Sequence, residues 1–327
     1  MVRFCRRLKE HLKLELHYIL EVYYFWGLIR KYNASSRTDR DIEKMQYTLS
    51  RETHTIEKGM SMRNPRKGFG QVKVFNLIRR LKKYCGLFLA QDSAFLDYPL
   101  NTIQSYINYT HSLGVDIPQI DSAFKDLLKV ANREFVNGKA GIMFETKEHI
   151  MEECNKNFES LLYSRHSMRY FSIEPVSRNL LNKALELAQR TPSACNRQGW
   201  QTHIYQASKS IDLIKWQGGS RGFEEEIRCA ILVTANMKAF LSHEVHQAYI
   251  DGGLYAMNLI NALHSLGLGT IPLSCGFNYS HLRKLQEFGV AKHEVPILII
   301  GIGHLPDKYY VAVSERKPIA KTNIYHE

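Results

Sequence analysis

The spacing of apolar residues changes near residue 140, and this change most constrains the fold. After it, short β-rich runs alternate with helical runs. Before it, apolar positions recur at helical spacing in four stretches, Arg3 to Lys31, Asp41 to Thr55, Gln71 to Leu89 and Asp92 to Asn137. The chain is therefore predicted to have a mainly helical region at residues 1–140 and an α+β domain at residues 141–327.

The α+β region alternates its elements in a regular order. Buried strands are predicted at residues 202–205, 230–235 and 296–302, the last with the apolar run Ile297 to Ile300. Helices are predicted around them at residues 146–163, 177–190, 208–217, 243–266 and 280–288. Such apolar strands need cover on both faces, so a layered domain is expected.

The positive charge is concentrated in the front third of the chain. The formal net charge is +12 over 327 residues, and residues 1–100 carry 20 Lys and Arg against 10 Asp and Glu. Basic and acidic side chains alternate there and no nucleic-acid reading motif is present, so nucleic acid is not the expected partner. An acidic polymer or a membrane surface remains an alternative partner for this region.

Six cysteines are scattered without a CxxC pair, which indicates reduced thiols and a cytoplasmic protein. The most apolar N-terminal stretch, residues 12–29, contains charged residues and is followed by no small-residue cleavage site. It is expected to be neither a spanning helix nor a signal peptide. Its aromatic cluster beside Arg30 and Lys31 leaves peripheral membrane contact as an alternative.

A first polar cluster runs from Ser164 to Phe171. Arg165 and Arg169 lie four residues apart with Ser167 between them, so together they can hold one multiply charged anion. Taken alone, the segment is better explained as a solvated basic turn.

A second cluster, Thr191 to Trp200, stands where a helix is predicted to end and a strand to begin. Its small residues let the backbone approach a flat ligand, and Asn196 and Gln198 offer donors and acceptors to the polar edge of a heterocycle. Alone, this loop could simply pack Trp200.

Taken together, four segments resemble the nitroreductase family of flavin enzymes over residues 158–327. They occur in the family's order and are Arg165 to Arg169, Pro192 to Gln198, Gly267 to Leu273 and Ser314 to Pro318. The resemblance implies an α/β/α sandwich that binds FMN without a covalent bond at the interface of a homodimer.

The resemblance also implies a role for individual residues. Arg165 and Arg169 resemble the ligands of the FMN phosphate, joined by Arg316 and Lys317, and His166 and Ser167 lie within the same motif, with Ser167 beside the pyrimidine and ribityl edge. The residues implied along or beside the isoalloxazine are Pro192, Ser193, Ala194, Asn196, Gln198, Pro272, Leu273 and Ser274.

The implied chemistry is hydride transfer from NADH or NADPH through flavin N5 to a small acceptor such as a nitro-aromatic or a quinone. The backbone N–H of Ser274 is implied to face N5. No acid or base side chain is required, because the cofactor carries the chemistry. The absence of a Gly-x-Gly-x-x-Gly fingerprint agrees with a nicotinamide that docks transiently.

Three features depart from the family pattern or invite another interpretation. Gly199 replaces the usual Pro after Gln198, which could loosen the turn, and the short stretch between Tyr205 and Cys229 indicates a reduced substrate cover. Cys195 and Cys275 fall in flavin-facing segments, but buried, unreactive cysteines are the favoured interpretation because no charged activator is evident.

No metal site is expected, because the pair His243 and His246 has no further ligands at suitable spacing. His54, Glu57 and Lys58 share a helical face and are interpreted as an ordinary polar face. The segment 54–70 is dense in charge, Gly and Pro, and one hypothesis makes it a lid or substrate selector over the flavin pocket.

Two functional alternatives remain open beside the nitroreductase-type enzyme. One is a flavin-dependent dehydrogenase or tailoring enzyme that acts on a partner-delivered or surface-bound substrate, with the helical region as its docking module. The other is a binding protein for an acidic polymer or a membrane surface, in which the flavin domain is secondary.

Overall fold

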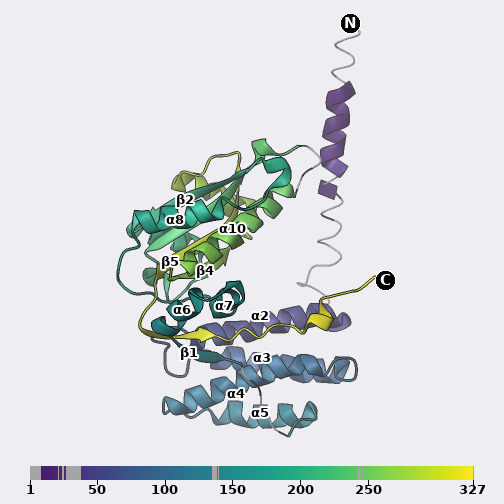
Figure 1. Cartoon of the computed structure of the whole chain (residues 1–327). Helices are drawn as coiled ribbons and strands as arrows, with labels where there is room; N and C mark the ends of the chain where they lie inside the picture. Colours follow the sequence, from purple (N-terminus) through teal and green to yellow (C-terminus); the bar gives the residue numbers. More distant parts are fainter. Residues whose placement is uncertain are drawn as a thin grey trace. The chain divides into compact units, whose positions relative to one another are not determined.

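The computed structural model describes residues 9–20, 22, 23, 26, 38–134, 138, 140–241, 244 and 246–326. The chain divides into two compact units (Figure 1). The sheet unit comprises residues 146–308 and also includes residues up to 32, and the helical unit comprises residues 33–145 and 309–327. The last 19 residues thus join the helical unit, whereas the sequence suggested an unbroken second domain from residue 141.

The sheet unit is built on an antiparallel sheet with strand order β2-β3-β5-β4. Its strands are β2 (Trp200–Gln206), β3 (Cys229–Asn236), β4 (Leu268–Ser274) and β5 (Glu294–His304). The centre of β3 pairs with both neighbours, since Leu232 lies opposite His203 and Ile299. The three predicted strands are therefore confirmed, and β2 and β4 form the two edges.

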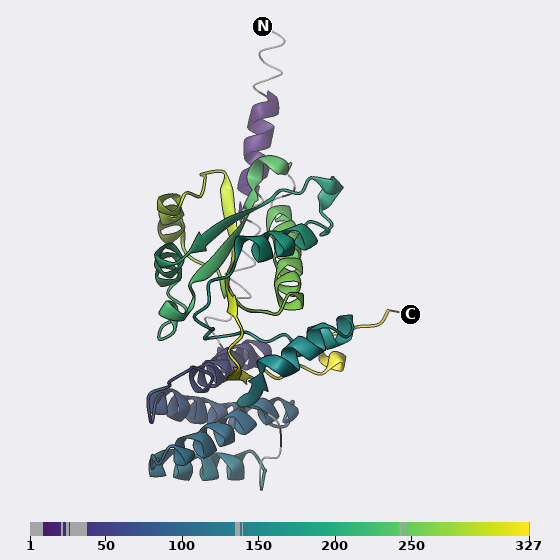
Figure 2. The same cartoon turned by 60° about the vertical axis from the view of Figure 1, so that its left-hand side comes forward.

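Helices flank both faces of this sheet (Figures 1 and 2). On one face α8 (Arg178–Ala188) and α10 (Gln247–Ser265) share a core with side chains such as Ile231, Val233 and Ile300. On the other face α9 (Ser208–Gln217) packs against β2 and β3. Successive strand residues point to opposite faces, so both faces of the sheet have side chains that helices can cover. The expected layered α+β architecture is confirmed.

The remaining elements of the sheet unit connect these layers. They are α6 (Lys147–Cys154), α7 (Phe158–Ser164), α11 (Tyr279–Leu282) and the 3₁₀ segments η3 (Ala194–Asn196), η4 (Glu224–Glu226), η5 (Met237–Ala239) and η6 (Arg283–Phe288). The helix predicted at residues 280–288 is thus one short α turn followed by a 3₁₀ segment.

The helical unit packs its long helices on a core of its own, with fully buried residues such as Leu49, Leu77 and Tyr106. These helices are α2 (Ile42–Met60), α3 (Gln71–Phe88), α4 (Asp97–Ser112) and α5 (Pro118–Val130), with short η1 (Thr38–Arg40) and η2 (Ala94–Leu96). The helical character predicted for this region is confirmed.

Two short strands, β1 (Ile142–Thr146) and β6 (Lys308–Ala312), pair with each other and explain why the chain end joins the helical unit. Residues 313–326 then continue on this unit and include η7 (Ile319–Lys321).

The predicted N-terminal helix from Arg3 to Lys31 lies partly outside the described residues. Residues 9–20 are helical, and apolar side chains such as Leu12, Leu16 and Ile19 are exposed there. Among the residues that the structure describes, no helix is long and apolar enough to cross a membrane.

Candidate functional site

The basic cluster lies along the free edge of β4. It follows α7 directly, and Ser167 forms a parallel bridge with Thr270 of β4. The backbone N–H of Met168 donates to the carbonyl oxygen of Thr270 at 2.8 Å. These contacts hold the half-buried residues Arg165, His166 and Ser167 at the sheet edge near Thr270.

Arg169 brings a guanidinium into the protein interior, where only 4% of the residue is exposed. One of its N–H groups donates to the carbonyl oxygen of Ser167 at 3.2 Å. Thr270, the residue bridged to Ser167, has a buried hydroxyl with no hydrogen-bond partner among the described residues. Two arginines with neighbouring hydroxyl donors suit a phosphate dianion, which needs several fixed charge-assisted bonds.

His264, on the last turn of α10, is affected by the positive charge of this cluster. Burial, together with the charges of Arg165 and His166, lowers the pKa of His264 to about 4. Its Nε2 lies 2.9 Å from the Ser164 hydroxyl and 3.5 Å from the Cys154 sulfur. A neutral His264 therefore braces the end of α7, directly before Arg165.

Every second residue of the edge strand β4 directs its backbone N–H and carbonyl groups away from β5, toward the free edge. The carbonyl of Thr270 points away from β5, because it accepts from Met168. Ser274 lies four residues further along a ladder without register shifts, so its N–H and carbonyl face the same edge. Its carbonyl accepts from the Gln217 side chain at 3.0 Å. Between them Pro272 is exposed and lacks an N–H, as edge strands tolerate.

The second cluster forms a strained loop ahead of β2. Cys195, Asn196 and Gln198 have φ values of 51°, 55° and 49°, in the left-handed region that non-glycine residues seldom adopt. The Ser193 hydroxyl accepts from the backbone N–H of Gln198 at 2.9 Å, and the side chains of Gln198 and Asn196 join at 3.1 Å. Such strain persists only where the surroundings hold it, and it is frequent at ligand sites.

Asp251 is the residue that sequence reasoning missed as the anchor of this loop. Its buried carboxylate, 1% exposed, accepts from the backbone N–H of Ala194 at 3.1 Å and from the Gln247 side chain at 2.8 Å. The sequence signal was present, because a carboxylate inside an apolar helix needs nearby donors. Arg197 adds a bidentate pair with Glu244 at 2.6 and 2.7 Å.

Gly199, where the family pattern has Pro, permits a close approach instead of loosening the turn. A Cβ atom here would lie 2.9 Å from the Cβ of Ala239 and from the ring of Phe240. The carbonyl of Gly199 accepts from the backbone N–H of Asn236 at 2.7 Å. Glycine at position 199 therefore allows the loop to pack closely against η5.

One chain keeps the two clusters apart. The basic cluster and Ser274 belong to the β4 edge, whereas the strained loop leads into β2 at the opposite edge. Three strand spacings separate these edges, about 14 Å. Along α10, Asp251 and His264 are 13 residues apart, or about 20 Å. In one chain, Arg165 and Ala194 thus lie at opposite edges of the sheet.

The two cysteines near these clusters differ in burial. Cys275 is buried, and burial raises its pKa to about 12, so it stays a thiol. Cys195 is exposed, so the expectation of a buried cysteine was wrong at this position. His243 lies outside the described residues, and no cluster of metal-ligating side chains occurs within the part that the structure describes.

Arg316 and Lys317 belong to the helical unit and make their contacts there. Arg316 donates to the carbonyl oxygen of Ser314, whose φ is 49°. The Lys317 ammonium lies 4.2 Å from the centre of the Tyr47 ring. Their assignment to a cofactor phosphate stays a prediction from the resemblance.

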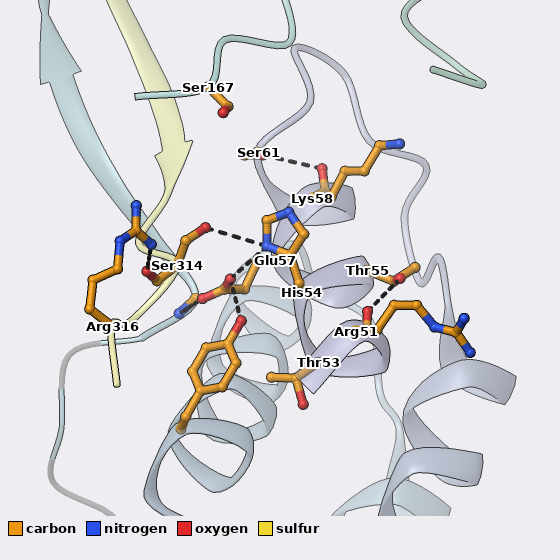
Figure 3. A network of polar contacts seen from close by, with 12 residues as sticks. Arg51, Thr53, His54, Thr55, Glu57, Lys58, Ser61, Ser167, Ser314 and Arg316 are labelled. Carbon is orange, nitrogen blue, oxygen red and sulfur yellow. Dashed lines mark hydrogen bonds and ion pairs between the residues drawn. The ribbon is translucent and has the colours of Figure 1, made fainter. Parts of the chain in front are cut away.

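The helical unit also contains a buried polar network around Glu57 (Figure 3). Its carboxylate is fully buried and accepts from the Tyr98 hydroxyl at 2.8 Å and from the backbone N–H of Gly141 at 3.1 Å. His54 Nδ1 lies 3.2 Å from this carboxylate and 3.3 Å from the Ser314 hydroxyl. The interpretation of Glu57 as part of an ordinary polar face was therefore wrong.

Comparison with known proteins identifies the sheet unit. Residues 162–304 match the model of the nitroreductase family. An Archaeoglobus fulgidus protein with the provisional name NADH dehydrogenase/NAD(P)H nitroreductase is 26% identical over 163 residues, 48% of this chain and 88% of its own length. An NADH dehydrogenase of Thermus thermophilus is 22% identical over 193 residues, 49% of this chain and 92% of its own length.

Solved structures resemble the same part of the chain. One is a provisionally named nitroreductase of Exiguobacterium sibiricum in complex with FMN, 19% identical, with a TM-score of 0.45 over 52% of this chain and 98% of that protein. The family match falls on the strands and helices that hold the basic cluster, the strained loop and the β4 edge. The chain thus carries a nitroreductase-family domain at residues 162–304, preceded by a mainly helical region.

Proposed function

We propose that this protein is an FMN-dependent oxidoreductase of the nitroreductase type, with NADH or NADPH as reductant and a small acceptor such as a nitro-aromatic or a quinone. The observation that supports it most is the donor set on the β4 edge. Ser167, between Arg165 and Arg169 in sequence, is bridged to Thr270, whose hydroxyl has no partner among the described residues. The family match over the same residues supports the choice of FMN.

The basic cluster would hold the phosphate of FMN. Arg165 and His166 add enough positive charge to help depress the pKa of His264, which is a favourable field for a dianion. Ser167 directly follows His166 in the chain and is held at the sheet edge by its bridge to Thr270. Arg316 and Lys317 are proposed as further phosphate ligands on the strength of the resemblance.

The β4 edge would orient the ring. FMN, when bound, supplies the hydride chemistry at its N5 atom. The N–H of Ser274 faces the free edge and is the proposed donor toward N5, while Pro272 and Leu273 give this stretch a surface with few competing donors. Pro192, Ser193, Ala194, Asn196 and Gln198 are proposed to contact the isoalloxazine.

A homodimer would bring the two clusters together. The strained loop and the basic cluster lie at opposite edges of one sheet, and a second copy would supply the loop that completes each site. The helix α10 offers a surface for that copy, because the apolar residues Ile250, Leu254 and Met257 recur at helical spacing and are 43–53% exposed. A two-fold axis near this helix would build two equivalent sites.

Subunit mixing tests this arrangement. One variant carries Arg165→Gln and Arg169→Gln, and a second carries Asn196→Ala and Gln198→Ala. Each alone should retain little FMN. After unfolding and joint refolding, half of the dimers are mixed, and each mixed dimer has one intact site, so about a quarter of all sites should bind FMN. Binding no better than in the separate variants would contradict a site shared between copies.

The cytoplasmic location is proposed from cysteine usage, and the described cysteines are all free thiols.

A further inference from the structure

A cavity of the sheet unit lies where β5 begins, apart from the residues assigned above. It has a volume of about 540 Å³. Its wall combines Tyr249 of α10, seven residues of the segment 282–292 around η6, and Glu294 to Pro296 of β5. Leu298 of β5 is the register partner of Ser274, so Pro296 lies only two residues, about 7 Å, further along the neighbouring strand.

The cavity has three charged lining residues, Arg283, Lys292 and Glu294. The Glu294 side chain is 5% exposed, and its carboxylate is already engaged by the sheet. It accepts from the Thr234 hydroxyl at 2.5 Å, lies 2.6 Å from His203 Nε2, and accepts from the backbone N–H of Ala291 at 3.3 Å. The Glu294 carboxylate is therefore hydrogen-bonded by groups outside the cavity lining, apart from Ala291.

The protonation of Glu294 agrees with this geometry. Burial alone would raise its pKa, but the hydrogen bonds from Thr234 and His203 outweigh burial and lower the pKa below its ordinary value. Glu294 thus stays ionised and bound to its donors near neutral pH, and it does not compete for a ligand in the cavity.

Arg283 and Lys292 both line the cavity and are exposed, so they can receive an anion. A guanidinium has five N–H donors, so Arg283 can bond an anion in addition to its existing contacts within the chain. Leu282, Leu285, Val290 and Val295 supply an apolar surface beside them. A cavity of this volume with apolar walls and a few placed charges is typical of small-molecule sites.

We infer that this cavity selects for an anionic group on the molecule that reacts at the proposed flavin site, with Arg283 and Lys292 as the residues that determine this specificity. The inference rests on the proposed function. The anion has two chemically similar sources, a carboxylate on an aromatic acceptor or the 2′-phosphate of NADPH, and in both cases an apolar or aromatic body carries it.

The test compares acceptors and reductants that differ only in this charge. The FMN-loaded protein is assayed with 4-nitrobenzoate against neutral 4-nitrobenzamide, and with NADPH against NADH. The variant Arg283→Gln/Lys292→Gln should lower the preference for one charged partner by at least about fivefold, through KM and with kcat for the neutral partner unchanged. Lys284→Gln, an exposed neighbour outside the lining, is the matched control.

Each outcome decides the inference. A loss confined to 4-nitrobenzoate assigns the anion to the acceptor, and a loss confined to NADPH assigns it to the reductant. Unchanged preference in both comparisons, or an equal loss in Lys284→Gln, overturns the inference.

A direct measurement keeps the inference separate from the proposed function. Calorimetric titration of the purified protein with 4-nitrobenzoate and, separately, with NADPH should give at least about fivefold weaker binding of one of these two ligands in the double variant, at constant ionic strength, whether or not turnover occurs. If FMN binding or neutral turnover fails while this difference persists, the proposed function fails and the anion site stands. Equal binding of both 4-nitrobenzoate and NADPH in wild type and double variant rejects the site.

Discussion

Asp251 holds the backbone amide of Ala194 at 3.1 Å and thereby links the first half of α10 to the strained loop before β2. Cys195, Asn196 and Gln198 in this loop have positive φ, so the shape of the loop depends on hydrogen bonds from residues outside it. This contact makes the helix α10 the common support of the loop and, through His264, of the basic cluster.

Replacing Asp251 by Asn should weaken FMN binding and lower the free energy of unfolding by about 1–3 kcal/mol, because a buried amide cannot accept from both donors in the same way. Equilibrium denaturation and fluorescence titration with FMN measure the two effects. Asp212→Asn, exposed on α9, serves as the control and should change neither. A variant that binds FMN like wild type would show that the loop does not depend on Asp251.

Replacing Leu254 by Asp should convert the protein from dimer to monomer and remove bound FMN. The charge would be buried in the proposed interface without a partner, which is strongly unfavourable. Analytical ultracentrifugation and the FMN absorbance report the two results. Leu187→Asp on α8 is matched in exposure, 46% against 49%, and should leave both unchanged. A dimeric Leu254→Asp variant that keeps FMN would exclude α10 as the interface.

His264 should make stability depend on pH in a defined window. Its pKa is about 4 in the folded chain against 6.5 for an ordinary histidine, so the unfolded chain binds more protons between these values. The contribution of His264 to the free energy of unfolding is fully present above pH 6.5. It is lost as the pH falls toward 4, by at most about 3 kcal/mol. Denaturation of wild type and His264→Asn at pH 7.5 and pH 5 should show the smaller loss in the variant. Equal losses would remove His264 as the cause.

Glu57→Gln should destabilise the helical unit by about 1–3 kcal/mol, because the amide replaces an acceptor of the Tyr98 hydroxyl and the Gly141 amide. Burial and the negative charge of Glu57 raise the pKa of Tyr98, which keeps its hydroxyl a donor. Thermal unfolding followed by tyrosine fluorescence measures the effect. Glu52→Gln, on the same helix and paired with Arg80 near the surface, should cost less than about 1 kcal/mol. Equal costs for the two variants would make the buried network unimportant.

The sequence predicted the elements whose periodicity is strong. The apolar runs of β3 and β5 and the long helices α2, α3 and α10 lie close to their expected positions, because burial of one face or of both faces leaves a clear pattern. The strands β1 and β6 were missed, since each has five residues and its partner is more than 160 residues away along the chain.

The candidate site was predictable only in its residue types. The motif residues Arg165, Arg169 and Ser274 lie on one sheet edge, and their roles toward FMN stay a prediction from the resemblance. For Asp251 the only sequence signal was a carboxylate inside an apolar helix, which does not name the loop as its partner. The strain at Cys195 and the burial of Glu57 left no sign, because they depend on tertiary contacts. The separation of the two clusters across the sheet is likewise a property of strand order.

The visible spectrum of the purified protein during titration with FMN, followed by anaerobic addition of NADH or NADPH, tests the central proposal most directly. Bound FMN should saturate at about one per chain and lose its absorbance near 450 nm when the nicotinamide is added, whereas Arg165→Gln/Arg169→Gln should retain little FMN. A protein that takes up no FMN, or one whose double variant retains FMN like wild type, would contradict the account.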